Sequence, residues 1–189
     1  MRAEPDFVFW HLAIHTGMRR GELLGLKWAD VDLAHGQVSV RRGVVAVGYQ
    51  VQISEPKTAR SRRLVALDDA TVRLLEEHRS VRNAAGGSVA GSAFLFAGAD
   101  GHPFHPDHVY GRFVRLRSLA GLPAIRFHDL RHTHATLALA SGVNPKIISE
   151  RLGHASVAFT MDVYSHAIPS LQADAARALA DLIGPPASR

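Results

Sequence analysis

The sequence predicts an α+β fold, a mostly helical single domain with a small three-stranded antiparallel sheet. Valine-rich alternation, which is typical of strands, occurs within residues 37–67. In the flanking regions apolar residues recur at helical spacing. The length of 189 residues suits one domain that buries a sizeable core, so we expect residues 1–189 to fold as a unit.

Two helices should precede the sheet. Residues 5–16 carry apolar side chains at helical spacing, and Gly17 is placed to close this first helix. A second helix should open near Arg19 and carry a cluster of leucines. A turn at residues 35–36 then leads into the strands.

The strands should form one antiparallel sheet. Valine alternates with other residues from 37 to 47, and Gly48 can turn the chain into a second strand at residues 49–53. A third strand fits residues 63–67. This arrangement places Lys57 in the turn between the second and third strands.

Helices and turns alternate after the sheet. Asp68 or Asp69 can cap the next helix. Gly, Ala and Ser then dominate residues 83–101, which we expect to be a surface loop. Another helix should span residues 105–119, with a proline at its first position.

The second half should be helical. One helix follows Asp129, another is capped by Asn144 with Pro145 at its first position, and a short one leads to Tyr164. The tail, residues 167–189, should hold a last helix with a stripe of Ala and Leu. That stripe either folds back onto its own core or docks on a neighbouring subunit, and the sequence leaves both arrangements open.

The composition favours a polyanionic partner. The formal net charge is +5 and the sequence pI is about 10.2, with basic residues crowded in the first third and in residues 112–131. The chain has no cysteine, which excludes disulfides, thiolate metal sites and cysteine nucleophiles. No apolar run approaches the roughly 20 residues of a membrane helix, so a cytoplasmic protein is the simplest interpretation.

Four side chains between residues 126 and 166 suggest one reaction centre. His128 and Arg131 are three positions apart, which places both on one face of a helix. His154 ends a Leu-Gly-His tripeptide, and Tyr164 follows ten positions later. A guanidinium, two imidazoles and a phenol suit attack on a phosphodiester, with the phenol as nucleophile and the others stabilising charge on the phosphoryl oxygens.

This stretch resembles the catalytic domain of the tyrosine recombinases, the phage integrase family. The matching residues form three blocks: His-Asp-Leu-Arg-His-Thr at 128–133, Leu-Gly-His at 152–154 and Tyr-Ser-His at 164–166. Upstream, residues 16–23 resemble the family's first-arginine motif, in which Arg19 is followed by Glu22. Residues 56–58, Pro-Lys-Thr, resemble its hairpin lysine.

The resemblance implies a site-specific DNA recombinase. Arg19, Arg131 and His154 would bind the scissile phosphate, and Tyr164 would attack it to form a 3′-phosphotyrosyl link. Lys57 would protonate the departing 5′-hydroxyl, because a guanidinium holds its proton too tightly to act as a general acid. Rejoining to another 5′-hydroxyl would require no metal and no cofactor.

The resemblance also implies supporting residues and partners. His128 would accept the tyrosine proton or orient the nucleophile, and Glu22 would hold the Arg19 side chain. The partner would be double-stranded DNA, bound by a homotetramer on paired sites. Five more arginines are expected to contact DNA: Arg20, Arg60, Arg62, Arg63 and Arg126.

Three alternatives remain. A type IB topoisomerase would use the same chemistry to relax one strand without a partner site. A non-catalytic DNA-binding remnant is suggested because the chain has no room for the family's amino-terminal core-binding domain. The third alternative is a metal site formed by the histidines within residues 102–108 or 128–134. No HExxH-type glutamate accompanies either group, so we expect no bound metal.

Overall fold

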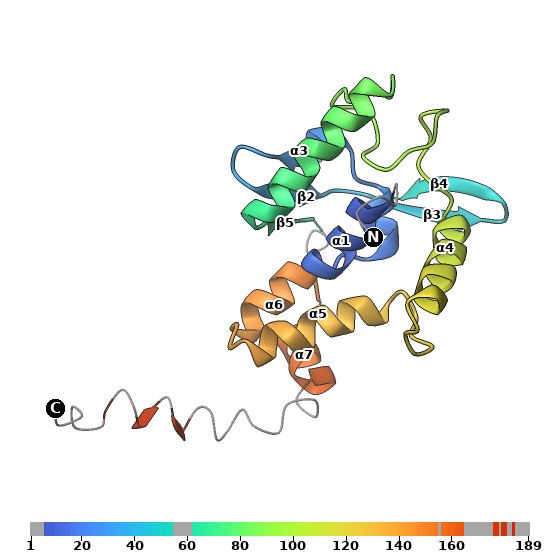
Figure 1. The fold of residues 1–189 in the computed structure, drawn as a ribbon. Helices are drawn as coiled ribbons and strands as arrows, with labels where there is room; N and C mark the ends of the chain where they lie inside the picture. The colour runs from blue at the N-terminus through green and yellow to red at the C-terminus, as the bar shows by residue number, and fades with distance from the viewer. Residues whose placement is uncertain are drawn as a thin grey trace.

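Helix α1 (Phe7–Thr16) lies at the centre of the fold and carries much of its aromatic core (Figure 1). The computed structural model describes residues 6–54, 62–154 and 156–164, together with 176, 177, 179, 180 and 183. Within these residues Phe9 is 1% exposed and contacts the rings of Phe96 and Phe127. The mostly helical α+β class predicted from the sequence is confirmed.

The turn after α1 brings distant segments together. Gly17 adopts the left-handed conformation, with φ of 63°, and ends α1 as predicted. A Cβ at this position would lie 2.5 Å from Leu152 Cδ2 and 2.8 Å from His134 Cδ2. The turn is therefore packed against two later helices, and it leads directly into α2 (Arg20–Leu24).

The strands form two sheets rather than one. β1 (Val31–Asp32), β2 (Gln37–Val40) and β5 (Arg63–Ala66) make a three-stranded antiparallel sheet in which Val38 pairs with Val65. β3 (Gly43–Val47) and β4 (Gln50–Ser54) form a separate antiparallel hairpin around Gly48. A 3₁₀ turn, η1 (Trp28–Asp30), precedes β1.

The predicted single sheet of residues 37–47, 49–53 and 63–67 was therefore wrong in its membership. The alternation breaks at Arg42, whose guanidinium turns inward to the buried carboxylate of Asp30 and to the carbonyl of Gly25. Val38 and Val40 lie in the core before this break, whereas Val47 on the hairpin is 56% exposed. An ion pair between residues distant in sequence gives no periodic signal, so the pattern alone could not reveal the break.

The later helices follow the predicted order: α3 (Asp69–Ala84), α4 (Pro106–Leu119), α5 (Asp129–Ala140), α6 (Pro145–Leu152) and α7 (Val157–Tyr164). Their predicted caps are present. The Asp68 carboxylate accepts the amide hydrogen of Thr71 at 2.9 Å, and the Asn144 side chain accepts that of Lys146 at 2.8 Å.

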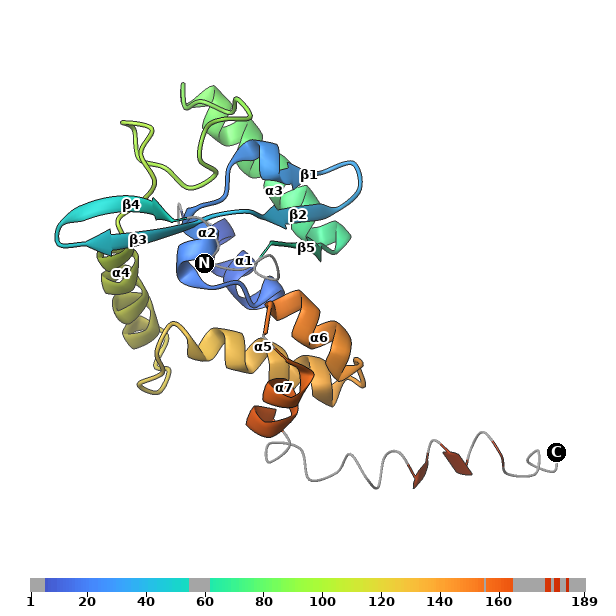
Figure 2. The same ribbon diagram turned by 180° about the vertical axis from the view of Figure 1, so that it is seen from behind.

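Helices α5, α6 and α7 gather on one side of α1, while the β3–β4 hairpin extends beside α4 on the other (Figure 2). α5 and α6 enclose a small second core of Ala135, Leu139, Ile148 and Leu152. The predicted tail helix, residues 167–189, lies almost wholly outside the described residues. No helix in the described part of the chain is long and apolar enough to cross a membrane.

Candidate active site

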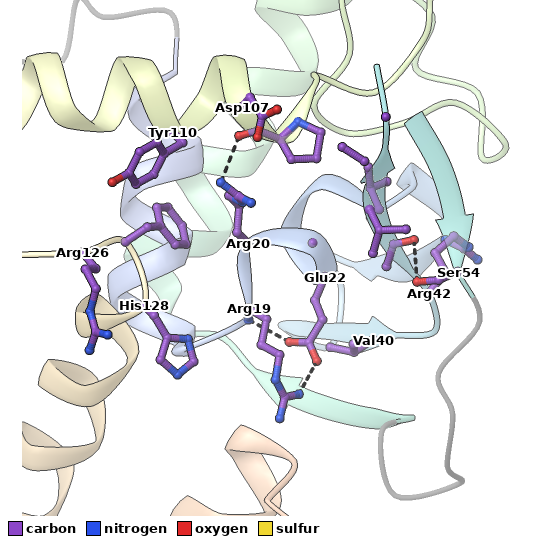
Figure 3. A pocket seen from close by; sticks show the side chains of 18 residues that line it. Arg19, Arg20, Glu22, Val40, Arg42, Ser54, Asp107, Tyr110, Arg126 and His128 are labelled. Carbon is purple, nitrogen blue, oxygen red and sulfur yellow. Dashed lines mark hydrogen bonds and ion pairs between the residues drawn. The ribbon is translucent and has the colours of Figure 1, made fainter. Parts of the chain in front are cut away.

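Arg19 stands at the amino end of α2 and is held by Glu22. The Arg19 backbone N–H donates to Glu22 Oε2 at 2.8 Å, and its guanidinium Nη1 donates to Oε1 at 2.8 Å (Figure 3). Glu22 thus binds both ends of Arg19, while the arginine side chain remains 43% exposed. The pairing inferred from the three-residue spacing is present, and it leaves the guanidinium accessible to a ligand.

Arg63, at the start of β5, also binds Glu22. Its Nη1 and Nη2 donate to the two carboxylate oxygens at 2.9 and 2.8 Å, and its side chain is only 6% exposed. Arg63 was expected to contact DNA. Its side chain lies mostly beneath the surface, where its planar fork matches the Glu22 carboxylate.

Arg131 on α5 is buried and joins two loops. Its Nη1 donates to the carbonyl of Gly17 at 2.8 Å, 114 positions away, and its Nη2 donates to the carbonyl of Leu152 at 2.7 Å. Arg19 Nη2 lies 3.5 Å from the next carbonyl, that of Gly153. The two arginines therefore meet at adjacent peptide groups, which brings the first-arginine motif to the Leu-Gly-His block.

Both predicted site histidines have a lowered pKa. Burial, followed by the charges of Arg131 and Arg19, lowers the pKa of His154 to about 4. His154 Nδ1 lies 2.8 Å from the hydroxyl of Thr160 on α7. Burial and the neighbouring His132 and Arg131 also lower the pKa of His128, which stands at the N-terminus of α5. Both imidazoles are therefore neutral near pH 7, beside two cations.

A cavity of about 1160 Å³ adjoins this centre between α2, the β3–β4 hairpin and the first turn of α4 (Figure 3). Arg19, Arg20, Arg126 and His128 line it. Arg20 donates to the carbonyl of Pro106 at 3.1 Å and so spans to α4. Arg126 is exposed and pairs with Asp129 at 3.0 Å. Cationic groups on several elements suit the groove to a phosphodiester backbone.

Three predicted site residues lie wholly or partly outside the described part of the chain. Lys57 and Arg60 lie outside the described residues, and so does the side chain of Tyr164, although the backbone of α7 runs to that position as predicted. Arg62 is exposed and lines a separate hollow with Arg41.

Sequence reasoning missed two supporting residues. Thr160 on α7 is fully buried, and its hydroxyl lies 2.8 Å from His154 Nδ1. Arg151 donates to the carbonyls of Ala66 and His15, at 2.8 and 2.9 Å, and thereby ties α6 to the ends of β5 and α1. Its role had no local signal, because both acceptors are backbone groups more than 80 positions away.

The histidines considered for metal binding include His105 and His134, which contact backbone groups and an arginine side chain. Within the described ranges, no group of three or more His, Asp or Glu side chains is positioned to hold a metal ion. His105 caps α4 by accepting the Asp107 amide hydrogen at 3.2 Å. His134 Nδ1 meets the carbonyl of Ile14 at 2.9 Å, and its Nε2 lies 3.3 Å from Arg151 Nε.

Comparison with known proteins agrees with this geometry. Residues 3–170 match the Phage integrase family. The chain is 34% identical over 188 residues to a tyrosine recombinase XerC-like protein of Caldanaerobacter subterraneus, covering 90% of this chain and 48% of that one. It is 32% identical over 179 residues to the ICEBs1 integrase of Bacillus subtilis, covering 93% and 48%. The chain thus spans about half the length of these relatives.

Solved structures share the fold. The Tn1549 transposon integrase in complex with a circular intermediate DNA matches with a TM-score of 0.76 and 26% identity, over 91% of this chain and 58% of that one. The XerA recombinase matches with a TM-score of 0.68 and 27% identity, over 95% and 58%. The family match and the sequence identity to the XerC-like recombinase agree with the order of the arginines, the histidines and α7 along the chain. This chain belongs to the phage integrase family of tyrosine recombinases.

Proposed function

We propose that residues 1–189 form the catalytic domain of a site-specific DNA recombinase or integrase. The observation that carries the proposal is the meeting of Arg19 and Arg131 at the adjacent carbonyls of Gly153 and Leu152. Two guanidiniums at adjacent peptide groups, with two neutral imidazoles near them, are suited to hold a phosphodiester and oppose the charge that its oxygens gain during attack.

In the proposed reaction, the hydroxyl oxygen of Tyr164 attacks phosphorus and forms a 3′-phosphotyrosyl bond. His128 accepts the phenol proton or orients the phenol, and Lys57 gives a proton to the departing 5′-oxygen. Arg19, Arg131 and His154 hold the phosphoryl oxygens. A 5′-hydroxyl of another strand then displaces the tyrosine, so the phosphodiester bond energy is retained.

The lowered pKa of His154 bears on its proposed role. A neutral imidazole beside two guanidiniums adds a directed hydrogen-bond donor or acceptor without adding a third positive charge. The Thr160 hydroxyl lies 2.8 Å from His154 Nδ1 and so holds the imidazole ring in one orientation.

The proposed partner is double-stranded DNA, bound by a homotetramer that pairs two recombination sites. The DNA complex of the Tn1549 integrase, and the similarity to a XerC-like tyrosine recombinase and to the ICEBs1 integrase, support this partner class. Arg20, Arg60, Arg62 and Arg126 are the proposed backbone contacts. Relatives from bacteria support a bacterial or phage protein that acts in the cytoplasm on the nucleoid.

Covalent capture tests the proposal. The 189-residue chain and its Tyr164→Phe variant are incubated with nicked duplex DNA in a chelator, denatured and separated on a gel. A protein–DNA adduct that requires Tyr164 is expected. DNA binding without an adduct would favour a non-catalytic module. Relaxation of a supercoiled plasmid without strand exchange between two sites would favour a topoisomerase.

A further inference from the structure

We propose that Arg63 is a positioning residue, which sets Arg19 through Glu22 and supports the turn at Leu152–Gly153, and that it is not a DNA contact. This inference rests on the proposed function, since its consequence is a faster cleavage step. Arg63 begins β5, six positions after Lys57, so it joins the sheet to both halves of the site.

The Glu22 carboxylate shows how Arg63 acts on Arg19. Oε1 accepts from Arg19 Nη1 at 2.8 Å and from Arg63 Nη1 at 2.9 Å. Oε2 accepts from the Arg19 amide at 2.8 Å and from Arg63 Nη2 at 2.8 Å. Four donors on two oxygens fix the plane of the carboxylate, and that plane in turn directs the Arg19 guanidinium.

Charge gives a second reason for Arg63. Glu22 alone would neutralise the charge of Arg19. With Arg63 present, the three side chains together carry a net charge of +1, and Arg19 is the exposed arginine of the two. Burial acts to raise the pKa of Glu22, but hydrogen bonds and charge from Arg63, together with Arg19, lower it below its usual value. The carboxylate therefore stays ionised and keeps both guanidiniums in place.

Arg63 also contacts the turn after α6. Its Nε donates to the Arg151 carbonyl at 2.7 Å. Gly153 is in the left-handed conformation, and a Cβ there would lie 3.1 Å from Arg63 Nη1 and 3.2 Å from its Cδ. The side chain is thus packed against the turn whose carbonyls at Leu152 and Gly153 receive Arg131 and Arg19. A single buried side chain supports both proposed phosphate-binding arginines.

The test compares Arg63→Gln and Arg63→Lys with Arg82→Gln. Arg82 serves as the matched control, because it also donates to backbone carbonyls, those of Ser88 and Ala97, but lies on α3. All variants are checked for cooperative thermal unfolding. Adduct formation is then timed on nicked random-sequence duplexes, from which the released 5′-hydroxyl strand diffuses away.

Arg63→Gln should slow adduct formation about 100-fold, the cost of misplacing a reacting group by about 1 Å. Arg63→Lys should not recover the rate, because an ammonium lacks the planar fork and the Nε donor. Arg82→Gln should cleave at the parent rate. Full activity of Arg63→Lys would show that charge alone matters and would overturn the proposal.

Salt dependence separates positioning from DNA contact. A phosphate contact contributes about 0.9 to the slope of log affinity against log salt. Arg63→Gln should leave this slope unchanged, whereas Arg126→Gln should reduce it by about 0.9. A reduced slope with an unchanged cleavage rate in Arg63→Gln would make Arg63 a DNA contact. In combination with Arg19→Gln, the effect of Arg63→Gln should shrink to the part that acts through the Leu152–Gly153 turn, and fully additive losses would contradict action through Arg19.

A readout without cleavage keeps the two proposals distinguishable. The Arg19 amide hydrogen, bound to Glu22 Oε2, should exchange faster in Arg63→Gln but not in Arg82→Gln. If the parent chain forms no Tyr164-dependent adduct, the proposed function fails, while faster exchange still supports positioning by Arg63. Unchanged exchange of this amide overturns the positioning role whatever the activity.

Discussion

Replacing Glu22 with glutamine should destabilise the fold strongly, because it removes a carboxylate that two arginines share. The substitution keeps the shape of the side chain but leaves one carbonyl oxygen and one amide group facing four donors. Arg19 can turn into solvent, since it is 43% exposed. Arg63 cannot, because its side chain is only 6% exposed, and it would lose the carboxylate that both of its terminal nitrogens bind.

The magnitude follows from that burial. Removing one partner of a buried ion pair typically costs about 3–5 kcal/mol of unfolding free energy. For a chain of 189 residues each kcal/mol corresponds to about 2–4 °C, so the melting temperature should fall by about 6–20 °C. The effect should also depend on pH. Because folding lowers the pKa of Glu22, its stabilisation is present above the usual value of 4.5 and is lost as the pH falls through the folded value.

The assay is urea unfolding of the parent chain, Glu22→Gln and the control Glu77→Gln, measured between pH 7 and pH 3. Glu77 is exposed on α3, and its replacement should change the unfolding free energy by less than about 0.5 kcal/mol. The difference between parent and Glu22→Gln should be largest at pH 7 and shrink in acid. A difference below about 1 kcal/mol at pH 7 would refute the view that this pair holds the site together.

Three further results are expected. Gly17→Ala should lower the unfolding free energy by about 2–5 kcal/mol, because the backbone is left-handed there and the added Cβ would clash with Leu152. Gly48 is also left-handed, but a Cβ there would contact nothing, so Gly48→Ala, measured likewise by urea unfolding, should cost about 1–2 kcal/mol. The unfolding free energy should decrease as the pH is lowered from 6.5 to about 4. Burial lowers the pKa of His134 to about 4, so the imidazole takes up a proton in the unfolded chain before it does so in the folded one, and His134→Gln should weaken this pH dependence. Arg126→Gln should lower affinity for duplexes of any sequence alike, measured by fluorescence anisotropy, and a sequence-selective loss would assign Arg126 to base recognition.

The elements that sequence reasoning located are those with local signals. Asp68 and Asn144 cap their helices through bonds to residues two or three positions away, so the sequence alone identifies the helix starts. Glu22 and Arg19 are likewise three apart on one helical turn. Motif spacing then places His128 and Arg131 at the start of α5, and both lie in the site region.

The features that sequence reasoning missed depend on distant contacts. The sheet divides where Arg42 turns to Asp30, twelve positions away, and Arg63 is buried because Glu22 lies 41 positions upstream. Neither event alters the alternation of valines or the local charge pattern. In sequence, an arginine near a basic cluster predicts a DNA contact, and its ion pair with Glu22 becomes visible only in the folded chain.

Identifying the residue that becomes covalently joined to DNA tests the proposed recombinase chemistry most directly. After trapping on nicked DNA in chelator, the adduct is digested with nuclease and protease, and the modified peptide is sequenced by mass spectrometry. A nucleotide joined through its 3′-phosphate to Tyr164 is expected. A nucleotide joined to another residue, or a joined 5′-phosphate, would contradict the proposed chemistry.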